Sequence, residues 1–456
     1  MASAAEQLAS NFSWGAIGQA KELRQRILFA LGLLIIYRIG TYIPMPGIDT
    51  VQLAEFVNRQ RDGILGVVNM FSGGAISRMA IFSLGIMPYI SASIIMQLMT
   101  SMVPSLEQLK KEGESGRKKI NQYTRYGTVL LATVQAYGVA VGLQGQGLAV
   151  NPGFFFIASA VITLVGGTMF LMWLGEQITA RGIGNGISLI IYVGIIAELP
   201  TALAQFFEQG RTGQIAAWLI IAVMLGAIAV IAFVVFLERA QRRIHVQYPK
   251  RQVGQKMYGG DSSHLPLKVN TAGVIPPIFA SSLLLMPQTL AGFSGPGGPE
   301  WLGFITSSLG RGQPLFLLVY IGLISFFCFF YTAVVFNPED VAENLKKQGG
   351  FVPGIRPGKR TSEYLDYVLT RLTVVGAIYL SAICALPELL TSRYSIPFYL
   401  GGTSVLIVVS VTMDTITQVQ SHLLAHQYEG LIEKSRLGGK NRAKARANRK
   451  TGRKRS

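Results

Sequence analysis

Three short patterns have the residue types of a catalytic or cofactor site, and none has the spacing that such a site needs. Residues 354–360, Gly-Ile-Arg-Pro-Gly-Lys-Arg, resemble a phosphate-binding loop, but the spacing is one residue short and Arg360 stands where Ser or Thr is required. Gly182, Gly184 and Gly186 alternate before an apolar stretch and lack the strand–turn–helix setting of a dinucleotide site. We therefore expect no nucleotide and no cofactor.

A helical metal site is the third pattern. His422 and His426 stand four residues apart, but Leu423 occupies the position where a His-Glu-x-x-His motif needs Glu. Cys328 and Cys384 lie inside apolar runs, so no disulfide framework is implied. No residue resembles a nucleophile with its base. The sequence predicts no catalytic residue and no metal ligand, which disfavours a membrane enzyme.

Basic side chains offer a different chemistry, the binding of an anionic partner. They cluster in three long segments between apolar stretches, and Pro353 and Pro357 stiffen the third segment. They are Lys110, Lys111, Arg117, Lys118 and Lys119; Arg239, Arg242, Arg243, Lys250 and Arg251; and Lys346, Lys347, Arg356, Lys359 and Arg360. These charges either keep the loops in one compartment or form a surface for RNA or an acidic protein. The tail from Lys434 to Arg455 is basic throughout and suits anionic lipid or RNA.

The composition sets the class of protein. Of 456 residues, 50% are hydrophobic and only 14% are charged, against roughly 25% in ordinary soluble domains. The net charge is +18. A soluble nucleic-acid binder would not combine that charge with a mean hydropathy of +0.41. The sequence predicts an all-α, multi-span membrane protein with basic loops.

Ten apolar stretches are long enough to be spans, and the first follows a polar lead without a cleavage site for a signal peptide. Most of the 41 Lys and Arg residues fall on one side if both termini are cytoplasmic, as the positive-inside rule requires. Five spans in each half permit an inverted repeat about an axis in the membrane plane. The stretches are 26–43, 79–103, 126–143, 154–175, 183–206, 214–237, 270–290, 314–336, 369–390 and 397–421.

Several features interrupt these spans. Residues 63–77 are apolar, too short to span and broken by Gly73-Gly74, which suits either a re-entrant half-helix or an interfacial helix. Pro88 and the pair Pro276-Pro277 should kink the second and seventh spans. Arg38, near the outer end of the first span, should extend its charge outward. Ser91, Gln135 and Asn270 are polar residues able to hydrogen-bond across helices, for about 0.6 kcal/mol each.

Long motifs in this chain resemble those of the SecY family, the channel subunits of the protein translocon, and its bacterial members most. The resemblance runs from about Arg24 to Glu429. The motifs are GIMPYISASIIMQ at 85–97, KKEGESGRKKINQYTRY at 110–126, LGEQITARGIGNGIS at 174–188, FNP at 336–338 and GFVPGIRPG at 350–358.

The resemblance implies a passive, gated channel for unfolded secretory proteins that also releases membrane segments sideways into lipid. Its waist would be a ring of isoleucines that dewets and seals softly around a passing chain. Residues 64–77, with Asn69, Met70, Phe71, Ser72, Gly73 and Gly74, would form a plug, and Ser91, Gln135 and Asn270 would hold shut a lateral gate between spans two, three, seven and eight. The ring would comprise Ile86, Ile90, Ile187, Ile191, Ile278 and Ile407.

The resemblance also implies partners and a domain plan in the bacterial inner membrane. SecE and SecG would complete the channel, SecA or the ribosome would drive it, signal sequences and nascent chains would pass through it, and SecDF, YidC and anionic lipids would contact it. Docking would use Arg242, Arg243, Lys250, Arg251, Arg356, Lys359 and Arg360. The plan is a lead (1–25), an N-terminal half (26–206), a C-terminal half (207–421) with cytoplasmic loops 238–269 and 337–368, and a tail (422–456).

A secondary transporter for a small solute is the main alternative. It shares the spans, the kinks and the inverted repeat. It gives no function to the three basic loops or to residues 64–77. The scarcity of carboxylates at mid-depth, with Asp414 alone in the last span, also argues against ion coupling.

Overall fold

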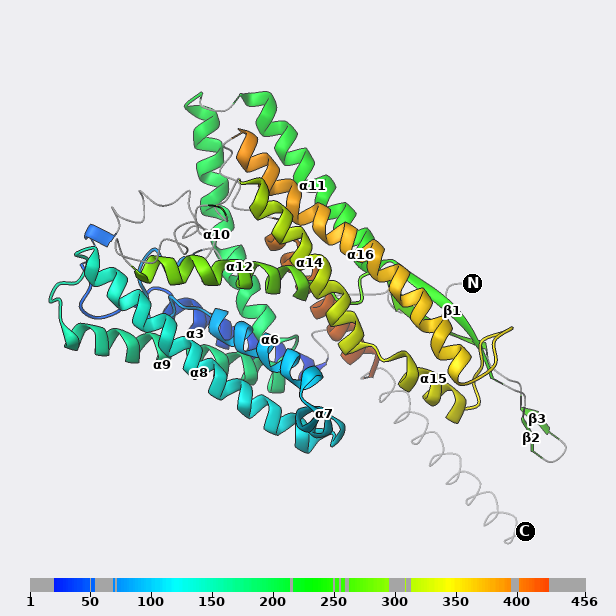
Figure 1. The fold of residues 1–456 in the computed structure, drawn as a ribbon. Coiled ribbons are helices and arrows are strands. Elements are labelled where there is room, and N and C mark those ends of the chain that lie inside the picture. Colours follow the sequence, from blue (N-terminus) through cyan, green and yellow to red (C-terminus); the bar gives the residue numbers. More distant parts are fainter. Residues whose placement is uncertain are drawn as a thin grey trace, which may run out of the picture. The chain divides into compact units, whose positions relative to one another are not determined.

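The chain is mostly helical in a computed structural model (Figure 1), as the sequence predicts. The structure describes residues 20–49, 51–53, 69, 72–213, 216–248, 251–253, 256–258, 262–294, 308, 313–394 and 402–425. Most of the lead and tail, Ile64–Val68, Met70, Phe71 and Lys250 lie outside these ranges.

Each of the ten predicted stretches coincides with a helix. Within the described ranges, seven helices are long and apolar enough to cross a membrane, or eight if α6 and α7, bent by 98°, form one span. The helices of the described ranges, whether or not they are long enough to span, are α3 (Lys21–Gly40), α6 (Met87–Met102), α7 (Pro104–Lys111), α8 (Glu114–Gly145), α9 (Phe154–Arg181), α10 (Gly186–Arg211), α11 (Ala217–Arg239), α12 (Ile275–Ser294), α14 (Pro314–Val335), α15 (Pro338–Lys347), α16 (Lys359–Tyr394) and Gly402–Ala425.

The prolines of the second and seventh stretches do not kink a helix, contrary to the prediction. Turns occupy residues 80–86, so Pro88 lies in the first turn of α6. Pro276 and Pro277 likewise lie in the first turn of α12. A proline is harmless there because the first N–H groups of a helix have no partner within it. Both helices therefore begin several residues after the starts of the apolar stretches that predicted them.

Four short strands lie in the loop 238–269, so the chain is not all-α as predicted. Strand β1 (Gln241–Gln247) pairs antiparallel with β4 (Ser262–Lys268), and β2 (Arg251–Val253) pairs with β3 (Lys256–Tyr258). Ile244 and Val246 are buried while their neighbours in β1 are largely exposed. This alternation is the pattern of a ribbon that covers a core with one face.

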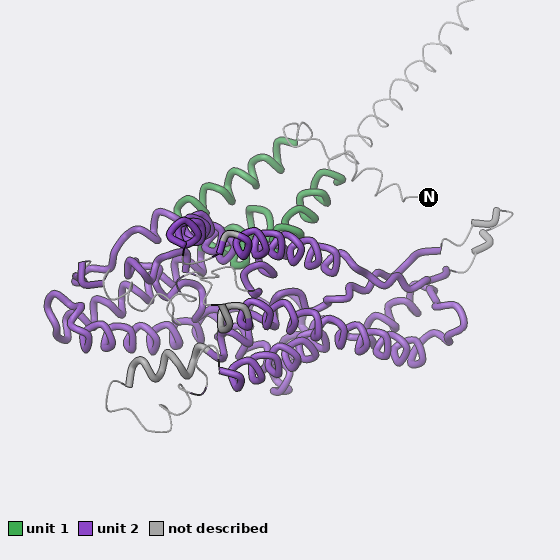
Figure 2. Tube along the Cα trace, turned by 90° about the horizontal axis from the view of Figure 1, so that it is seen from above, with its two compact units in different colours: residues 1–36, 174–189, 411–456 green, residues 37–173, 190–410 purple. Residues whose placement is uncertain are grey.

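The chain divides into two compact units (Figure 2). The first comprises residues 1–36, 174–189 and 411–456. Its core consists of Ala20, Leu23, Ile183 and Leu423. The backbone N–H of Gly184 donates to Gln418 Oε1 (2.8 Å), and that of Gly186 donates to Thr179 Oγ1 (2.8 Å). The alternating glycines therefore form the tight turn between α9 and α10.

The second unit comprises residues 37–173 and 190–410. Small residues let its helices approach closely, since Ala136 and Ala140 of α8 share a core with Ala160 and Leu164 of α9. Helix α6 packs on α8, and α12 packs on α6, α8 and α14. Helices α14 and α16 run side by side (Figure 1).

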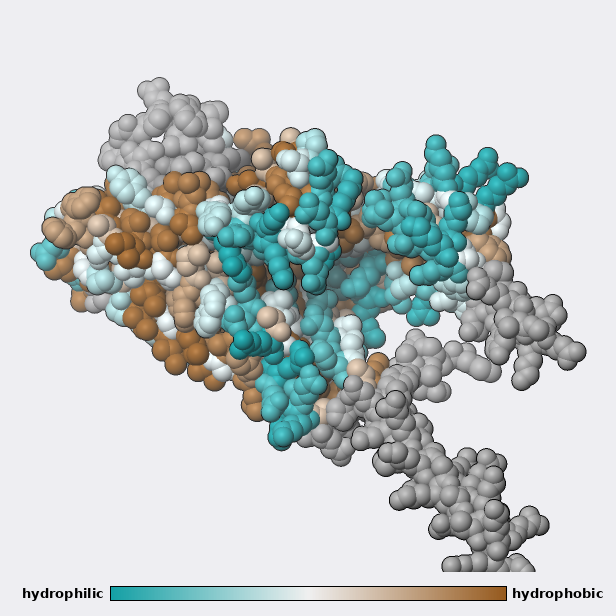
Figure 3. Space-filling model, turned by 90° about the horizontal axis from the view of Figure 1, so that it is seen from below, coloured by the Kyte–Doolittle hydropathy of each residue, from teal (hydrophilic) through white to brown (hydrophobic). Residues whose placement is uncertain are grey.

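Apolar side chains are also exposed over a wide area, as Figure 3 shows for one face. Helix α11 has apolar residues on all sides until Glu238, yet of its described side chains only Val234 is fully buried. Trp218, Ile221 and Phe236 of this helix are more than half exposed. A helix with this composition needs a hydrocarbon surrounding, which is the environment of a membrane span.

Candidate functional site

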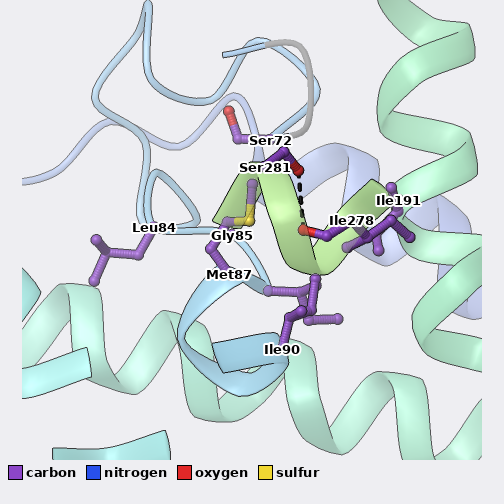
Figure 4. A pocket seen from close by; sticks show the side chains of 9 residues that line it. Ser72, Leu84, Gly85, Met87, Ile90, Ile191, Ile278 and Ser281 are labelled. Carbon is purple, nitrogen blue, oxygen red and sulfur yellow. Dashed lines mark hydrogen bonds between the residues drawn. The ribbon is translucent and has the colours of Figure 1, made fainter. Parts of the chain in front are cut away.

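A narrow pocket lies among helices of the second unit, where α6, α10 and α12 meet the turn 72–79 (Figure 4). Its free volume is about 10 Å³, close to the least that holds one water molecule. The lining is mainly aliphatic and has no charged side chain. It comprises Ser72, Leu84, Gly85, Ile86, Met87, Ile90, Ile191, Ile278 and Ser281.

The starts of two helices position the isoleucines of this pocket. Ile86 caps the N-terminus of α6 and Ile90 follows one turn later. Ile278 stands in the first turn of α12, where its carbonyl accepts from Ser281 Oγ (2.9 Å; Figure 4). Ile191 comes from α10, and Ile86, Ile90 and Ile191 are each more than nine-tenths buried. The pocket is therefore an apolar constriction with fixed walls.

Two residues of the predicted ring are not among the pocket lining. Ile187 stands at the start of α10 and belongs to the first unit, where its N–H donates to Asn185 Oδ1 (3.2 Å). Ile407 belongs to the helix Gly402–Ala425 and is 1% exposed. The structure thus brings four of the six isoleucines together around one space.

The described residues of the predicted plug form a compact turn beside the pocket. Asn69 closes it, since its carbonyl accepts from Gly74 N (2.9 Å) and its Oδ1 accepts from Ser77 N (2.8 Å). Gly73 and Gly74 have φ of +65° and +80°, values that favour glycine. Ser72 is 4% exposed and lines the pocket. The turn therefore forms part of the pocket wall.

The three predicted gate residues lie on neighbouring elements without contacting one another by hydrogen bonds in the described part of the chain. Ser91 is on α6, Gln135 is on α8 and Asn270 precedes α12. Asn270 Nδ2 instead donates to Glu238 Oε1 (2.7 Å) and to the carbonyl of Gly273 (3.1 Å). Asn270 therefore connects α12 to the end of α11.

The second and third basic loops pack together. Gln247 of β1 and Phe351 exchange two backbone hydrogen bonds of 2.9 Å each. A separate hydrophobic core lies beneath them, made of Ile244, Leu267, Ala342, Val352, Leu365 and Val368. We call this assembly of β1, β4, α15, residues 348–358 and the start of α16 the loop module. Its basic side chains thereby gain a rigid base.

Arg356 is exposed at a bend of this module. The adjacent Ile355 packs on the core and Thr361 Oγ1 donates to the Arg356 carbonyl (2.9 Å), which fixes the backbone. Among the described residues, the Arg356 guanidinium has no hydrogen bond or ion pair. Lys359 and Arg360, both exposed, open α16. Positive charge at a helix N-terminus opposes the helix dipole, so it does not serve the stability of α16.

The remaining basic residues predicted for docking lie on the short strands, and two lysines of the basic loops form ion pairs. Arg242 and Arg243 are exposed on β1, and Arg251 is in β2. On α7 and α15, Glu107 pairs with Lys111 (2.8 Å) and Glu343 with Lys347 (2.9 Å). A hydrogen bond from the lysine lowers the pKa of each carboxyl. No group of three or more potential metal ligands occurs in the ranges that the structure describes.

Sequence reasoning missed Tyr37, Tyr42, Arg78, Glu198 and Glu238, which make polar contacts near the pocket or the gate residues. Tyr42, Arg78 and Glu238 stand at the ends of apolar stretches, where a polar residue is common. Glu198 was detectable, since it is a carboxylate within the fifth stretch. The strands were detectable too, because residues 241–247 and 262–268 include alternating apolar residues.

Long apolar helices, exposed apolar side chains and a narrow apolar pocket define a helical membrane protein. The family model SecY matches residues 80–416, so the chain belongs to the SecY family. It is 58% identical to the protein translocase subunit SecY of Pseudomonas aeruginosa, over 92% of this chain and 96% of that one. The predicted resemblance is confirmed, and the transporter and enzyme alternatives are wrong.

Solved structures share the fold. One is a SecY protein whose plug domain is described as stabilising the closed state of the translocation channel and maintaining a membrane seal. It has a TM-score of 0.62 and 20% identity, over 88% of this chain and 92% of that one. Another is Sec61 in a canine ribosome–channel complex from the endoplasmic reticulum. Its TM-score is 0.62 at 20% identity, over 88% and 94% of the two chains.

Proposed function

We propose that this chain is the central pore subunit of a SecYEG translocon, a gated channel that passes unfolded secretory proteins across the bacterial inner membrane. The observation that carries the proposal is the constriction formed by Ile86, Ile90, Ile191 and Ile278, which has room for about one water. A passage this narrow and apolar dewets and excludes ions. Aliphatic side chains make no directional bonds, so they form a seal around a translocating chain whatever its sequence. Ile187 and Ile407 complete the ring.

The plug comprises residues 64–77, and its turn at Ser72–Gly74 closes one side of the constriction. The SecY structure with the described plug domain supports this assignment at the level of the fold. Ten spans in two inverted five-helix halves, 26–206 and 207–421, surround the pore, and both termini are cytoplasmic. The lead (1–25) and the basic tail (422–456) flank the halves in the cytoplasm.

The lateral gate opens to lipid between spans two, three, seven and eight. The packing of α12 on α6, α8 and α14 supports this, because the gate then requires only that α12 and α14 move from α6 and α8. Ser91, Gln135 and Asn270 line it from three elements. Membrane segments leave through this gate instead of crossing the membrane.

The loop module docks SecA or the ribosome. Arg242, Arg243, Arg356, Lys359 and Arg360 present basic groups on a packed base. We assign Lys250 and Arg251, which belong to the same basic loop in the sequence, to this docking function as well. The canine Sec61 structure in a ribosome–channel complex supports a ribosomal partner. SecE and SecG cover apolar helix surface from within the membrane, and SecDF, YidC, anionic lipids, signal sequences and nascent chains are further partners.

The test is import of a preprotein into vesicles that contain this chain with SecE and SecG. We expect ATP and SecA to move the preprotein to a protease-protected location. Vesicles with SecE and SecG alone provide the control. Equal protection in both vesicle types would contradict the proposed function, as would import that needs no SecA and no ribosome.

A further inference from the structure

We propose that Tyr37, Arg38 and Glu198 form a latch that holds the Ser72–Gly74 turn in its position beside the pocket. The proposal rests on the proposed function in one respect, that this turn belongs to the plug. The three side chains come from two helices far apart in sequence, α3 and α10. We call them the turn latch.

Two consecutive residues of α3 bind two consecutive carbonyls of the turn. Tyr37, which is 2% exposed, donates from Oη to the carbonyl of Ser72 (3.3 Å). Arg38 Nη1 donates to the carbonyl of Gly73 (2.6 Å). Both acceptors are backbone atoms, so these hydrogen bonds depend on the position of the turn and not on the side chains of its residues. The bond from Arg38 has a charged donor and is consequently the stronger of the two.

Tyr42 orients the Arg38 guanidinium. Arg38 Nη2 donates to Tyr42 Oη (3.1 Å), one helical turn further along the chain. The guanidinium carbon of Arg38 lies 5.0 Å from the centre of the Tyr42 ring, and that of Arg78 lies 4.1 Å from it. An arginine that only extended its charge toward water would not need these contacts. The sequence predicts that Arg38 extends its charge outward, but it does not indicate these contacts, which depend on the fold.

Glu198 limits what can occupy position 74. A Cβ atom built at Gly74 would collide with Glu198 Oε1, so the carboxylate lies directly against the backbone of the turn. The same Cβ would be 3.4 Å from Arg78 Nη1, an atom that is buried and has no hydrogen-bond partner among the described residues. The side of Gly74 that has no side chain thus faces both a carboxylate on α10 and the guanidinium of Arg78.

The turn is built to move as one piece. Asn69, Ser72 and Ser77 hold its shape through bonds within residues 69–77, independently of α3 and α10. Among the described residues, the Tyr37 and Arg38 hydrogen bonds tie its first residues to α3, while Glu198 and the backbone of Gly194 lie against it from α10. Weakening the latch should therefore release the turn without unfolding it, and the closed state should lose population in proportion to each bond removed.

Solvent access to Ser72 measures the latch directly. Ser72→Cys, in a chain with Cys328 and Cys384 replaced by Ala, is labelled by a maleimide that cannot cross the membrane. With Arg38→Met we expect labelling to be about ten-fold faster, as loss of a hydrogen bond from a charged donor implies. Arg38→Lys keeps one donor and should give an intermediate rate. Arg24→Met, an exposed arginine of the same helix, is the matched control and should leave the rate unchanged.

A second pair of variants tests Glu198. Gly74→Ala should also speed labelling, because alanine is strained at this positive φ and its Cβ would collide with Glu198. Adding Glu198→Ala relieves the collision but not the backbone strain, so it should restore part of the protection. The latch would be refuted if the parent and Arg38→Met were labelled at equal rates. It would also be refuted if the double variant Gly74→Ala, Glu198→Ala were labelled as fast as Gly74→Ala alone. Preprotein import is measured separately on the same vesicles. Failed import by the parent chain would refute the proposed function, while the labelling rates would still decide the latch.

Discussion

The side-chain amide of Asn270 donates to the carboxylate of Glu238 at 2.7 Å, and so joins the start of the α12 region to the end of α11. Asn270 is 4% exposed, so water does not replace this bond. The amide of Asn270 is therefore a hydrogen-bond donor to a carboxylate that is partly shielded from water. Any effect of Asn270 on a lateral gate should therefore depend on its hydrogen bond to Glu238 of α11, and not on Ser91 or Gln135.

Substitution of Asn270 should therefore have a graded effect. Asn270→Leu removes a donor from a partly buried carboxylate, which costs about 1–3 kcal/mol. Asn270→Asp should be worse, because two carboxyl groups then meet. The measurement is export of a client with a weakened signal sequence, together with the thermal midpoint in detergent. Asn151→Leu, at an exposed loop position, is the control. Parent-like behaviour of Asn270→Asp would show that the bond to Glu238 has no part in gating.

The isoleucines of the constriction should keep the membrane tight to ions. Ile86→Gly and Ile191→Gly widen and wet the pocket, so we expect reconstituted bilayers to conduct in the absence of a preprotein. Ile196→Gly makes the same change on α10 at a side chain that is 37% exposed, and should not leak. Conductance is recorded at matched protein amounts. If all three variants are equally ion-tight, these isoleucines do not form the seal.

Arg356 should be sensitive to a change that keeps its charge. Lys cannot reproduce the two parallel hydrogen bonds of a guanidinium, so Arg356→Lys should weaken partner binding roughly ten-fold while leaving abundance normal. Arg356→Glu should be more severe. SecA-driven import into vesicles with equal amounts of each variant is the measurement, and Arg117→Glu on α8 is the control for net charge. Full activity of Arg356→Lys would reduce Arg356 to a topology charge.

Two adjacent glycines of α9 should respond oppositely to alanine. A Cβ at Gly167 would collide with the carbonyl of Ile81, whereas a Cβ at Gly166 meets no atom within 4 Å. Gly167→Ala should therefore destabilise the protein by about 1–3 kcal/mol through overpacking. Gly166→Ala should stabilise it by roughly 0.5–1 kcal/mol through lower chain entropy. Thermal midpoints in one detergent check both signs, and two shifts of the same sign would contradict this helix packing.

The helices could be predicted from the sequence because a membrane span requires a long apolar stretch, and each of the ten stretches overlaps a helix. Helix starts were harder to predict. Hydropathy cannot separate the turns at 80–86 from α6, since both are apolar, and so Pro88 was assigned to mid-span. The same difficulty misplaced Pro276 and Pro277. A proline followed by an unbroken apolar run signals a helix start as well as it signals a kink.

The candidate site was only partly predictable. The ring isoleucines came from the family resemblance, because an isoleucine in a pore wall and one in a helix interface have the same neighbours in sequence. The contacts of Asn270 with Glu238 and of Arg38 with Gly73 span 32 and 35 residues. Such pairings depend on how helices meet in space. Composition and periodicity contain no information on them.

The shared core of the loop module has a consequence for synthesis. Leu267 reaches the ribosome exit well before Val352 and Leu365, which complete its packing. Translation at ~5–20 residues per second leaves an interval of roughly 5–20 s in which the apolar face of the β1–β4 ribbon has no cover. Two apolar stretches, those that contain most of α12 and α14, must be made during that time. The loop module is therefore completed only after the two helices between its parts have been made, and a chain truncated before residue 350 would leave the apolar face of the ribbon exposed and prone to aggregation.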